Sequence, residues 1–135
     1  MKNIFSAIAI ICTIIAFSSC EKDEGKLPAI SFKTGGNYIS HNDTIAVDSN
    51  IVIGINASKS EDKDVLKKFN ISKSINGGSS SSIYDVDLTG DDKDNYNYDF
   101  KTKVDNIKGQ STQYSFTVTN RDGLTNTISV TVVGK

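Results

Sequence analysis

The chain has 135 residues, 15 of them basic and 16 acidic, and a formal net charge of −1. This length suits one domain with its own core, and the balanced charge gives no basis for binding nucleic acid or an anionic membrane surface. Both cysteines, Cys12 and Cys20, lie near the N-terminus, so the remaining sequence has no thiol for a disulfide, a metal site or a nucleophile.

The N-terminus has the layout of a bacterial signal peptide. Lys2 precedes an apolar run over residues 4–17, and two serines come directly before Cys20. The run of about 14 residues is shorter than the roughly 20 that a helix needs to span a bilayer. Acidic residues follow it rather than a basic cluster that would stop transfer. We therefore expect a cleaved signal peptide and not a transmembrane helix.

This segment resembles the type II signal peptide of lipoproteins, in which a lipobox ends at the acylated cysteine, here residues 17–20. The resemblance implies that residues 1–19 are removed and that Cys20 carries two or more acyl chains, which anchor a protein stably. Lys22, Asp23 and Glu24 resemble the export signal that sends Bacteroidetes-type lipoproteins to the cell surface. The expected location is the outer membrane, lipid-anchored and surface-exposed, with a periplasm-facing position as the alternative.

Residues 20–27 are expected to form the acylated cysteine and a flexible tether, and residues 28–135 a single domain. Alternating apolar residues predict six strands, around residues 51–55, 69–71, 84–88, 96–100, 114–118 and 128–132. Residues 29–32 and 44–47 supply one more strand, broken in two by Gly35 and Gly36. About seven strands with turns at this spacing predict an all-β antiparallel sandwich.

Turn-forming residues separate the predicted strands. Residues 76–82 and 89–92 are expected to be loops, and Asp122 with Gly123 indicates a tight hairpin. The strand pair on either side of that hairpin, residues 114–120 and 128–132, resembles the closing hairpin of polycystic-kidney-disease-type and related immunoglobulin-like domains. Such domains are common in bacterial surface proteins, and the resemblance implies an immunoglobulin-like sandwich.

Successive strands of an antiparallel sandwich run in opposite directions, so every second loop lies at the same end. Loops 58–65, 89–95 and 120–123 should therefore share the end at which the tether enters, with loops 76–82 and 105–112 at the opposite end. The acidic residues at the shared end are Glu61, Asp62, Asp64, Asp91, Asp92, Asp94 and Asp122. Calcium binding is one hypothesis for this cluster, because Ca²⁺ takes six to eight oxygen ligands. Solvated loop acids are the alternative, and we assign no metal site.

Residues suited to catalysis are scarce. His41 is the only histidine, and its neighbours Ser40 and Asp43 cannot line up with it as a triad, because adjacent residues on an extended chain point in alternate directions. Residues 85–96 superficially resemble an EF-hand loop, but Tyr96 occupies the position of the bidentate Glu. We therefore predict neither an enzyme nor a cofactor.

Two further patterns bear on ligands. Tyr96, Tyr98 and Phe100 share one face of a strand, which favours a core position over a flat platform for carbohydrate. Asp43, Thr44 and Ile45 resemble the site at which exported Bacteroidetes-type proteins are O-glycosylated, which makes Thr44 a candidate modification site.

The expected function is a lipid-anchored binding or adhesion module without catalysis, whose loops recognise an unknown protein or glycan. The alternative is an accessory subunit of an outer-membrane complex, such as glycan-uptake machinery, with no ligand of its own.

Overall fold

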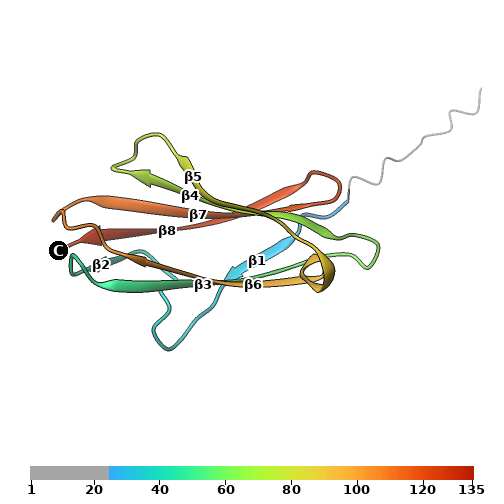
Figure 1. Ribbon diagram of the computed structural model, residues 1–135, viewed down its shortest axis with the longest axis horizontal. Helices are drawn as coiled ribbons and strands as arrows, with labels where there is room; N and C mark the ends of the chain where they lie inside the picture. Colours follow the sequence, from blue (N-terminus) through green and yellow to red (C-terminus); the bar gives the residue numbers. More distant parts are fainter. Residues whose placement is uncertain (1–24) are drawn as a thin grey trace, which may run out of the picture.

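The computed structural model describes residues 25–135, which form a sandwich of two β-sheets (Figure 1). The predicted signal peptide, Cys20 and the export residues Lys22, Asp23 and Glu24 lie outside the described residues. No helix within residues 25–135 is long and apolar enough to cross a bilayer.

One sheet has three strands in the order β1-β3-β6, and the other has five in the order β2-β8-β7-β4-β5. The strands of the first sheet are β1 (Ala29–Phe32), β3 (Asn50–Ser58) and β6 (Asn95–Lys103). Those of the second are β2 (Asp43–Ile45), β4 (Leu66–Ile75), β5 (Ser81–Asp87), β7 (Ser111–Asn120) and β8 (Thr125–Gly134). A short 3-10 helix, η1 (Gly90–Lys93), precedes β6. The predicted all-β immunoglobulin-like sandwich is confirmed.

The expected first strand is two strands in different sheets, which raises the predicted count of about seven to eight. β1 pairs antiparallel with β3, whereas β2 crosses over and pairs parallel with β8, the one parallel pairing between the named strands. The break is where the sequence placed it, at Gly35 and Gly36, whose φ angles are +82° and +55°. Two successive residues in the left-handed region cannot continue a strand.

The turn after β4 is tighter than predicted. Asn76 and Gly77 both have positive φ, 49° and 70°, and the Gly78 N–H donates to the Ile75 carbonyl oxygen at 2.9 Å, as in a type I′ turn. The expected loop over residues 76–82 was too long, because Ser81 and Ser82 already belong to β5. At the β7–β8 hairpin, Gly123 has a φ of +83°, which confirms the predicted turn.

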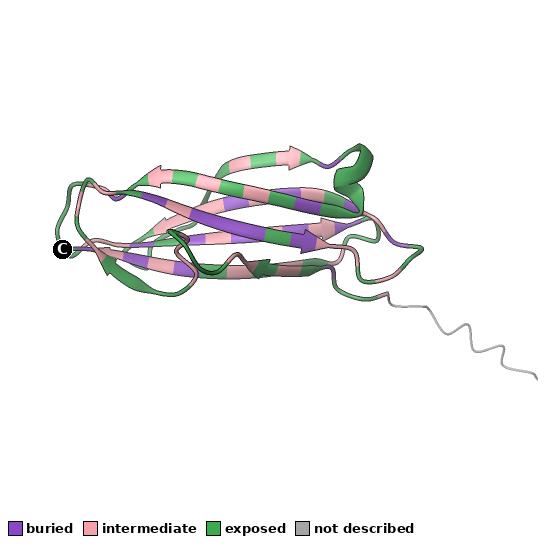
Figure 2. Ribbon diagram, turned by 90° about the horizontal axis from the view of Figure 1, so that it is seen from below, coloured by how far each residue is buried: buried purple, intermediate pink, exposed green. Residues whose placement is uncertain are grey.

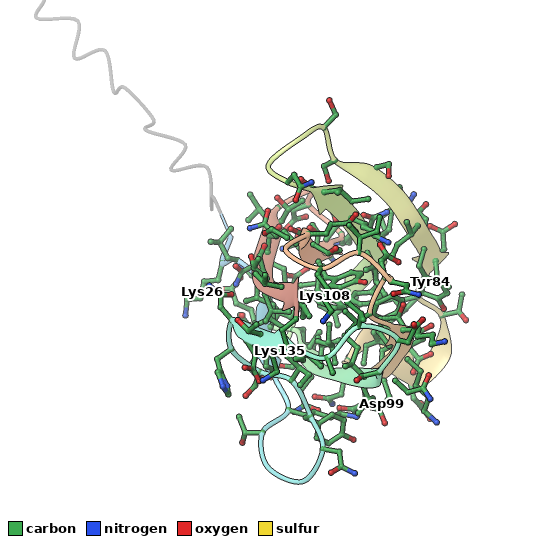
Figure 3. The ribbon with its side chains drawn as sticks, turned by 90° about the vertical axis from the view of Figure 1, so that its left-hand side faces the viewer. Lys26, Tyr84, Asp99, Lys108 and Lys135 are labelled. Atoms are coloured by element: carbon green, nitrogen blue, oxygen red, sulfur yellow. The ribbon has the colours of Figure 1, made fainter. Side chains whose placement is uncertain are left out.

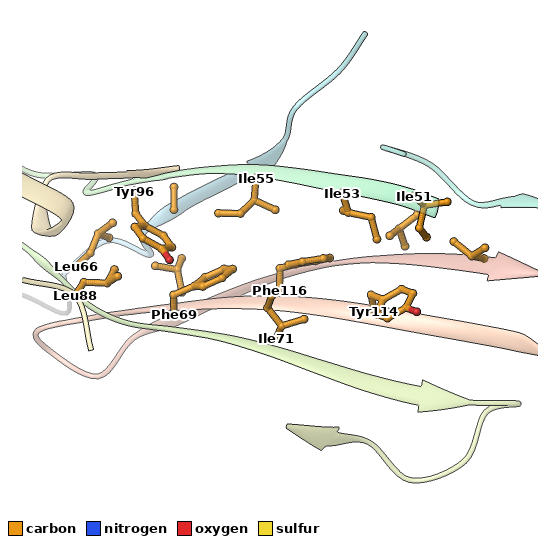
Figure 4. Close-up of a cluster of buried hydrophobic side chains, with 14 of the residues drawn as sticks. Ile51, Ile53, Ile55, Leu66, Phe69, Ile71, Leu88, Tyr96, Tyr114 and Phe116 are labelled. Carbon is orange, nitrogen blue, oxygen red and sulfur yellow. The ribbon is translucent and has the colours of Figure 1, made fainter. Parts of the chain in front are cut away.

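The core lies between the sheets, where the inward side chains of β3, β4, β6, β7 and β8 meet (Figures 2 and 4). Ile53, Ile55, Phe69, Ile71 and Phe116 have no solvent exposure. Alternation of buried and exposed residues along these strands follows the predicted apolar pattern, so the hydrophobic effect sets the register.

Aromatic rings fill the side of the sandwich between β5 and β6. Tyr96 is buried, and Tyr98 and Phe100 are half-buried against the core, so the prediction that these rings are core is confirmed. The Tyr84 ring on β5 stacks on Tyr98 with centroids 4.9 Å apart, and Phe69 lies beneath both. This cluster connects the two sheets at their free edges.

Burial gives Tyr96 an expected effect at alkaline pH. Desolvation, followed by its hydrogen bond with Tyr84, raises the pKa of Tyr96 well above the usual value. An unfolded tyrosine loses its proton near pH 10. Stability should therefore be complete below about pH 10 and fall as the pH rises from there toward the folded pKa. Urea unfolding between pH 8 and 11 measures this, and Tyr96→Phe, which keeps the ring, should flatten the decline. An equal fall in stability in the wild type and in Tyr96→Phe would show that Tyr96 does not cause the alkaline loss.

Candidate binding surface

The outer face of the three-stranded sheet carries an ordered array of side chains. Alternate residues of its strands face outward, and the antiparallel register aligns them in rows across the sheet. From the end at which residue 25 enters, these rows are Ala29, Ser58 and Asn95; Ser31, Asn56 and Asn97; Lys33, Gly54 and Asp99; Val52 and Lys101; and Asn50 and Lys103.

The third row carries a ridge formed by Lys33, Tyr38 and Asp99. The connection between β1 and β2 runs outside the sheet (Figure 1) and lays the Tyr38 ring over Gly54. Lys33 Nζ lies 2.7 Å from Asp99 Oδ1, and the Tyr38 hydroxyl donates to Asp99 Oδ2 at 3.1 Å. Lys33, and then the Tyr38 hydroxyl, lower the pKa of Asp99, so its carboxylate is charged at neutral pH. The ridge is therefore held in place at physiological pH.

Gly54 is required for this arrangement. A Cβ at this position would lie 2.6 Å from Cε1 of Tyr38 and 2.7 Å from Cδ of Lys33. Any other residue would displace the ridge, because carbon atoms cannot approach so closely. A glycine inside a strand marks such a close approach. This was the signal in the sequence that could have revealed the ridge.

The ridge separates two shallow hollows on this face. The neutral hollow, toward residue 25, is lined by Ala29, Ile30, Ser31, Asn56, Ala57, Ser58, Asn95 and Asn97. The basic hollow, toward the C-terminus, is lined by Asn37, Asn50, Ile51, Val52, Lys101, Thr102 and Lys103. Sequence reasoning placed recognition in the loops and missed both hollows.

The outer face of the five-stranded sheet is different, because its polar side chains bond to one another. Ser115 and Ser129 hydroxyl oxygens are 2.8 Å apart, and those of Thr117 and Thr127 are 2.7 Å apart. On its β4–β5 side, Asn70 donates to Ser82 and Asp85, and Lys68 pairs with Asp85 at 3.1 Å. These groups satisfy each other across the strands.

The three acidic loops share one end of the sandwich, as predicted, and residue 25 enters at the same end (Figure 1). Two of the carboxylates form ion pairs: Asp94 accepts from Lys59 at 2.8 Å, and Asp122 pairs with Arg121 at 3.4 Å. Within residues 25–135, no three His, Cys, Asp or Glu side chains are grouped so that they could hold a metal ion. The described geometry therefore gives the calcium hypothesis no support.

A buried network at this end fixes the start of the domain. Asp64 is 2% exposed and Asn120 is fully buried, and Asn120 Nδ2 donates to Asp64 Oδ2 at 2.7 Å. The same amide reaches the Lys26 carbonyl oxygen at 3.3 Å, and Ser60 Oγ donates to that of Leu27 at 2.6 Å. Contacts with the domain thus begin before Pro28.

The opposite end presents the turn at residues 76–77 and the loop over residues 104–110 (Figure 3). Ile75 and Ile107 are 42% and 58% exposed there. Beside them, Asp105 accepts from Lys73 at 3.2 Å and from Gln110 at 2.7 Å. This end therefore combines a rigid polar network with two exposed apolar side chains.

Of the remaining predicted residues, Thr44 lies exposed on β2, and its backbone N–H donates to the Asp43 carboxylate at 2.7 Å. His41 is exposed in the connection between β1 and β2. Neither residue lines the neutral or the basic hollow.

No protein-family model matches this sequence, and no curated protein matches it. Solved structures do resemble the fold. Superoxide reductase (neelaredoxin) from Ignicoccus hospitalis superposes with a TM-score of 0.52 at 9% identity, over 82% of this chain and 81% of that one. A variant of that protein gives a TM-score of 0.54 at 11% identity, over 87% and 86% of the two chains.

The CARDB domain of a Pyrococcus furiosus protein is 17% identical, with a TM-score of 0.46, and the match covers 82% of this chain and 99% of that one. At 9–11% identity, the two superoxide reductase structures show a shared sandwich fold and nothing about this chain's activity.

Proposed function

We propose that this protein is a non-catalytic binding module, anchored in the outer membrane by lipid on Cys20 and exposed on the cell surface. Lys22, Asp23 and Glu24 direct its export, and the sandwich displays the outer face of the three-stranded sheet. The entry of residue 25 at the acidic end supports this orientation, because a membrane anchor five residues earlier holds that end near the bilayer.

The observation that carries the proposal is the contrast between the two outer faces. Polar groups on the five-stranded sheet bond to one another, whereas the three-stranded sheet has two hollows beside a fixed ridge. Binding sites are concave and largely preformed. A rigid scaffold that holds such hollows open suits recognition of a ligand.

Catalysis has no support from the described side chains. His41 is exposed on the β2 side, and the carboxylates near the hollows are engaged by lysines, as Asp99 is by Lys33. We therefore assign recognition, and no reaction, to this domain.

The alternative, an accessory subunit of a larger envelope complex, is favoured by the exposed apolar side chains at the end farther from residue 25. Ile75 and Ile107 are the kind of residue that a partner protein covers. In that case the partner contacts the end of the sandwich and not its three-stranded face.

In-cell photocrosslinking tests the proposal. A photoreactive residue at Asn97 should yield a high-mass product in living cells, whereas the same residue at Thr117, on the other outer face, should not. Cys20→Ala should abolish incorporation of labelled palmitate and remove the crosslinked product. Palmitate incorporation that is absent from the wild type, or unchanged in Cys20→Ala, would refute the anchor. One dominant protein product from Ile107, with none from Asn97, would favour the accessory subunit.

A further inference from the structure

We propose that the neutral hollow binds an uncharged carbohydrate chain. This inference rests on the proposed binding function and adds the chemical class of the ligand. The polar residues that would contact it are Ser31, Asn56, Ser58, Asn95 and Asn97.

These five side chains form a regular grid. Ser31, Asn56 and Asn97 are cross-strand neighbours on β1, β3 and β6, and Ser58 and Asn95 form the next row. Neighbouring strands lie about 4.8 Å apart, and successive outward residues along a strand about 6.8 Å apart. A grid of this spacing can contact several consecutive units of an extended ligand.

The hydrogen-bonding capacity of the grid is unused. No side-chain hydrogen bond within residues 25–135 involves any of the five, and all but the half-buried Ser58 are exposed. Each asparagine offers two donors and one acceptor group, and each serine offers a donor and an acceptor. The complement to such a surface is a ligand dense in hydroxyl groups, which also donate and accept.

Charge excludes the main competing ligands. No ionisable side chain lines the neutral hollow. The charges on either side of it are paired: Lys33 with Asp99 on the ridge at 2.7 Å, and Lys59 with Asp94, next to Ser58 and Asn95, at 2.8 Å. Phosphate and acidic polymers need Lys or Arg contacts, which this hollow lacks. The basic side chains Lys101 and Lys103 lie beyond the ridge, in the other hollow.

The composition also disfavours a protein partner here. Protein interfaces are anchored by Trp, Tyr, Arg or Met side chains at their centre. The neutral hollow contains none of these, and its only apolar lining residues are Ala29, Ile30 and Ala57. A polyhydroxyl chain uses the exposed amides without needing such an anchor.

Affinity electrophoresis of the detergent-solubilised full-length protein tests the ligand class. The probes are soluble neutral polysaccharides (α-glucan, β-glucan, mannan and galactomannan), with polygalacturonate as the acidic comparison. At least one neutral polymer should retard the protein, and polygalacturonate should not. Asn56→Ala and Asn97→Ala should each weaken binding about tenfold through lost hydrogen bonds. Gln113→Ala is the matched control, because this exposed amide lies on β7 of the five-stranded sheet, outside both hollows, and it should bind like the wild type.

Retardation by no neutral polymer, or equal binding by wild type and both hollow variants, would overturn the inference. Self-association through this face, seen as a dimer that Asn97→Ala dissolves, would also overturn it. If the crosslinker at Asn97 still captures a protein in cells, the binding module stands and only the ligand class is wrong. If it captures nothing and no polymer binds, the proposed function falls as well.

Discussion

Asn120→Ala should lower the free energy of unfolding by about 3 kcal/mol, a large part of the stability of a domain this size. The amide is fully buried at the end of β7 and makes three hydrogen bonds. Its Nδ2 donates to Asp64 Oδ2 and to the Lys26 carbonyl oxygen, and its Oδ1 accepts from the Leu124 N–H at 2.8 Å. Truncation leaves the buried Asp64 carboxylate with the Val65 N–H alone, at 2.8 Å. An incompletely satisfied buried charge is costly.

Urea denaturation of the purified protein measures this loss, and a double-mutant cycle identifies its cause. Asp64→Ala should be destabilising by a similar amount, and the double variant should lose less than the sum of the single losses, because the pair is already broken. Asn126→Ala is the matched control, since this half-buried amide makes one hydrogen bond, to the Pro28 carbonyl oxygen at 2.9 Å. Asn126→Ala should lower the free energy of unfolding by about 1 kcal/mol. Additive losses in the cycle would show that Asn120 and Asp64 act independently.

Most of the fold could be predicted because its strands are half-buried. Alternating apolar residues such as Ile51, Ile53 and Ile55 can reach the core only in one register, so pattern and structure coincide. The common end of the three acidic loops could also be predicted, because antiparallel strands place every second loop at the same end. The same reasoning could not show that residues 29–32 and 43–45 separate into two sheets. A short strand carries no information about its partner, and the parallel β2–β8 pairing depends on the path of the ten residues between.

The binding surface was harder to predict because it depends on residues far apart in the sequence. The ridge joins Lys33, Tyr38 and Asp99 over Gly54, and no local pattern connects position 38 with position 99. Asp64, which bonds to the buried Asn120, was likewise grouped with the acidic loop residues, since an acidic residue in a charged loop looks solvated in sequence. In both cases side chains from distant parts of the sequence meet only after the sheets have packed.

Phe69→Ala should lower the free energy of unfolding by about 3–5 kcal/mol, the range expected for truncation of a fully buried Phe. Phe69 on β4 has no solvent exposure. Its ring centroid lies 5.1 and 5.7 Å from those of Tyr96 and Tyr98 on β6, and 6.2 Å from that of Tyr84 on β5. It therefore connects the two sheets where both have a free edge, and the cavity left by truncation would lie beneath the Tyr84–Tyr98 stack.

Urea denaturation measures the change in the free energy of unfolding. Phe69→Leu, which keeps much of the side-chain volume, should lower it by about 1–2 kcal/mol. Phe32→Ala is the control, because this half-buried ring contacts one other ring, that of Phe116, and should cost less than Phe69→Ala. Along β6, Tyr96 and Tyr98 alternate with Asn95 and Asn97, so the cluster also positions the neutral hollow on the opposite face of the strand. Phe69→Ala should consequently weaken polysaccharide binding at temperatures where the protein remains folded. Binding equal to that of the wild type would show that the three-stranded sheet holds its outer face without support from the aromatic cluster.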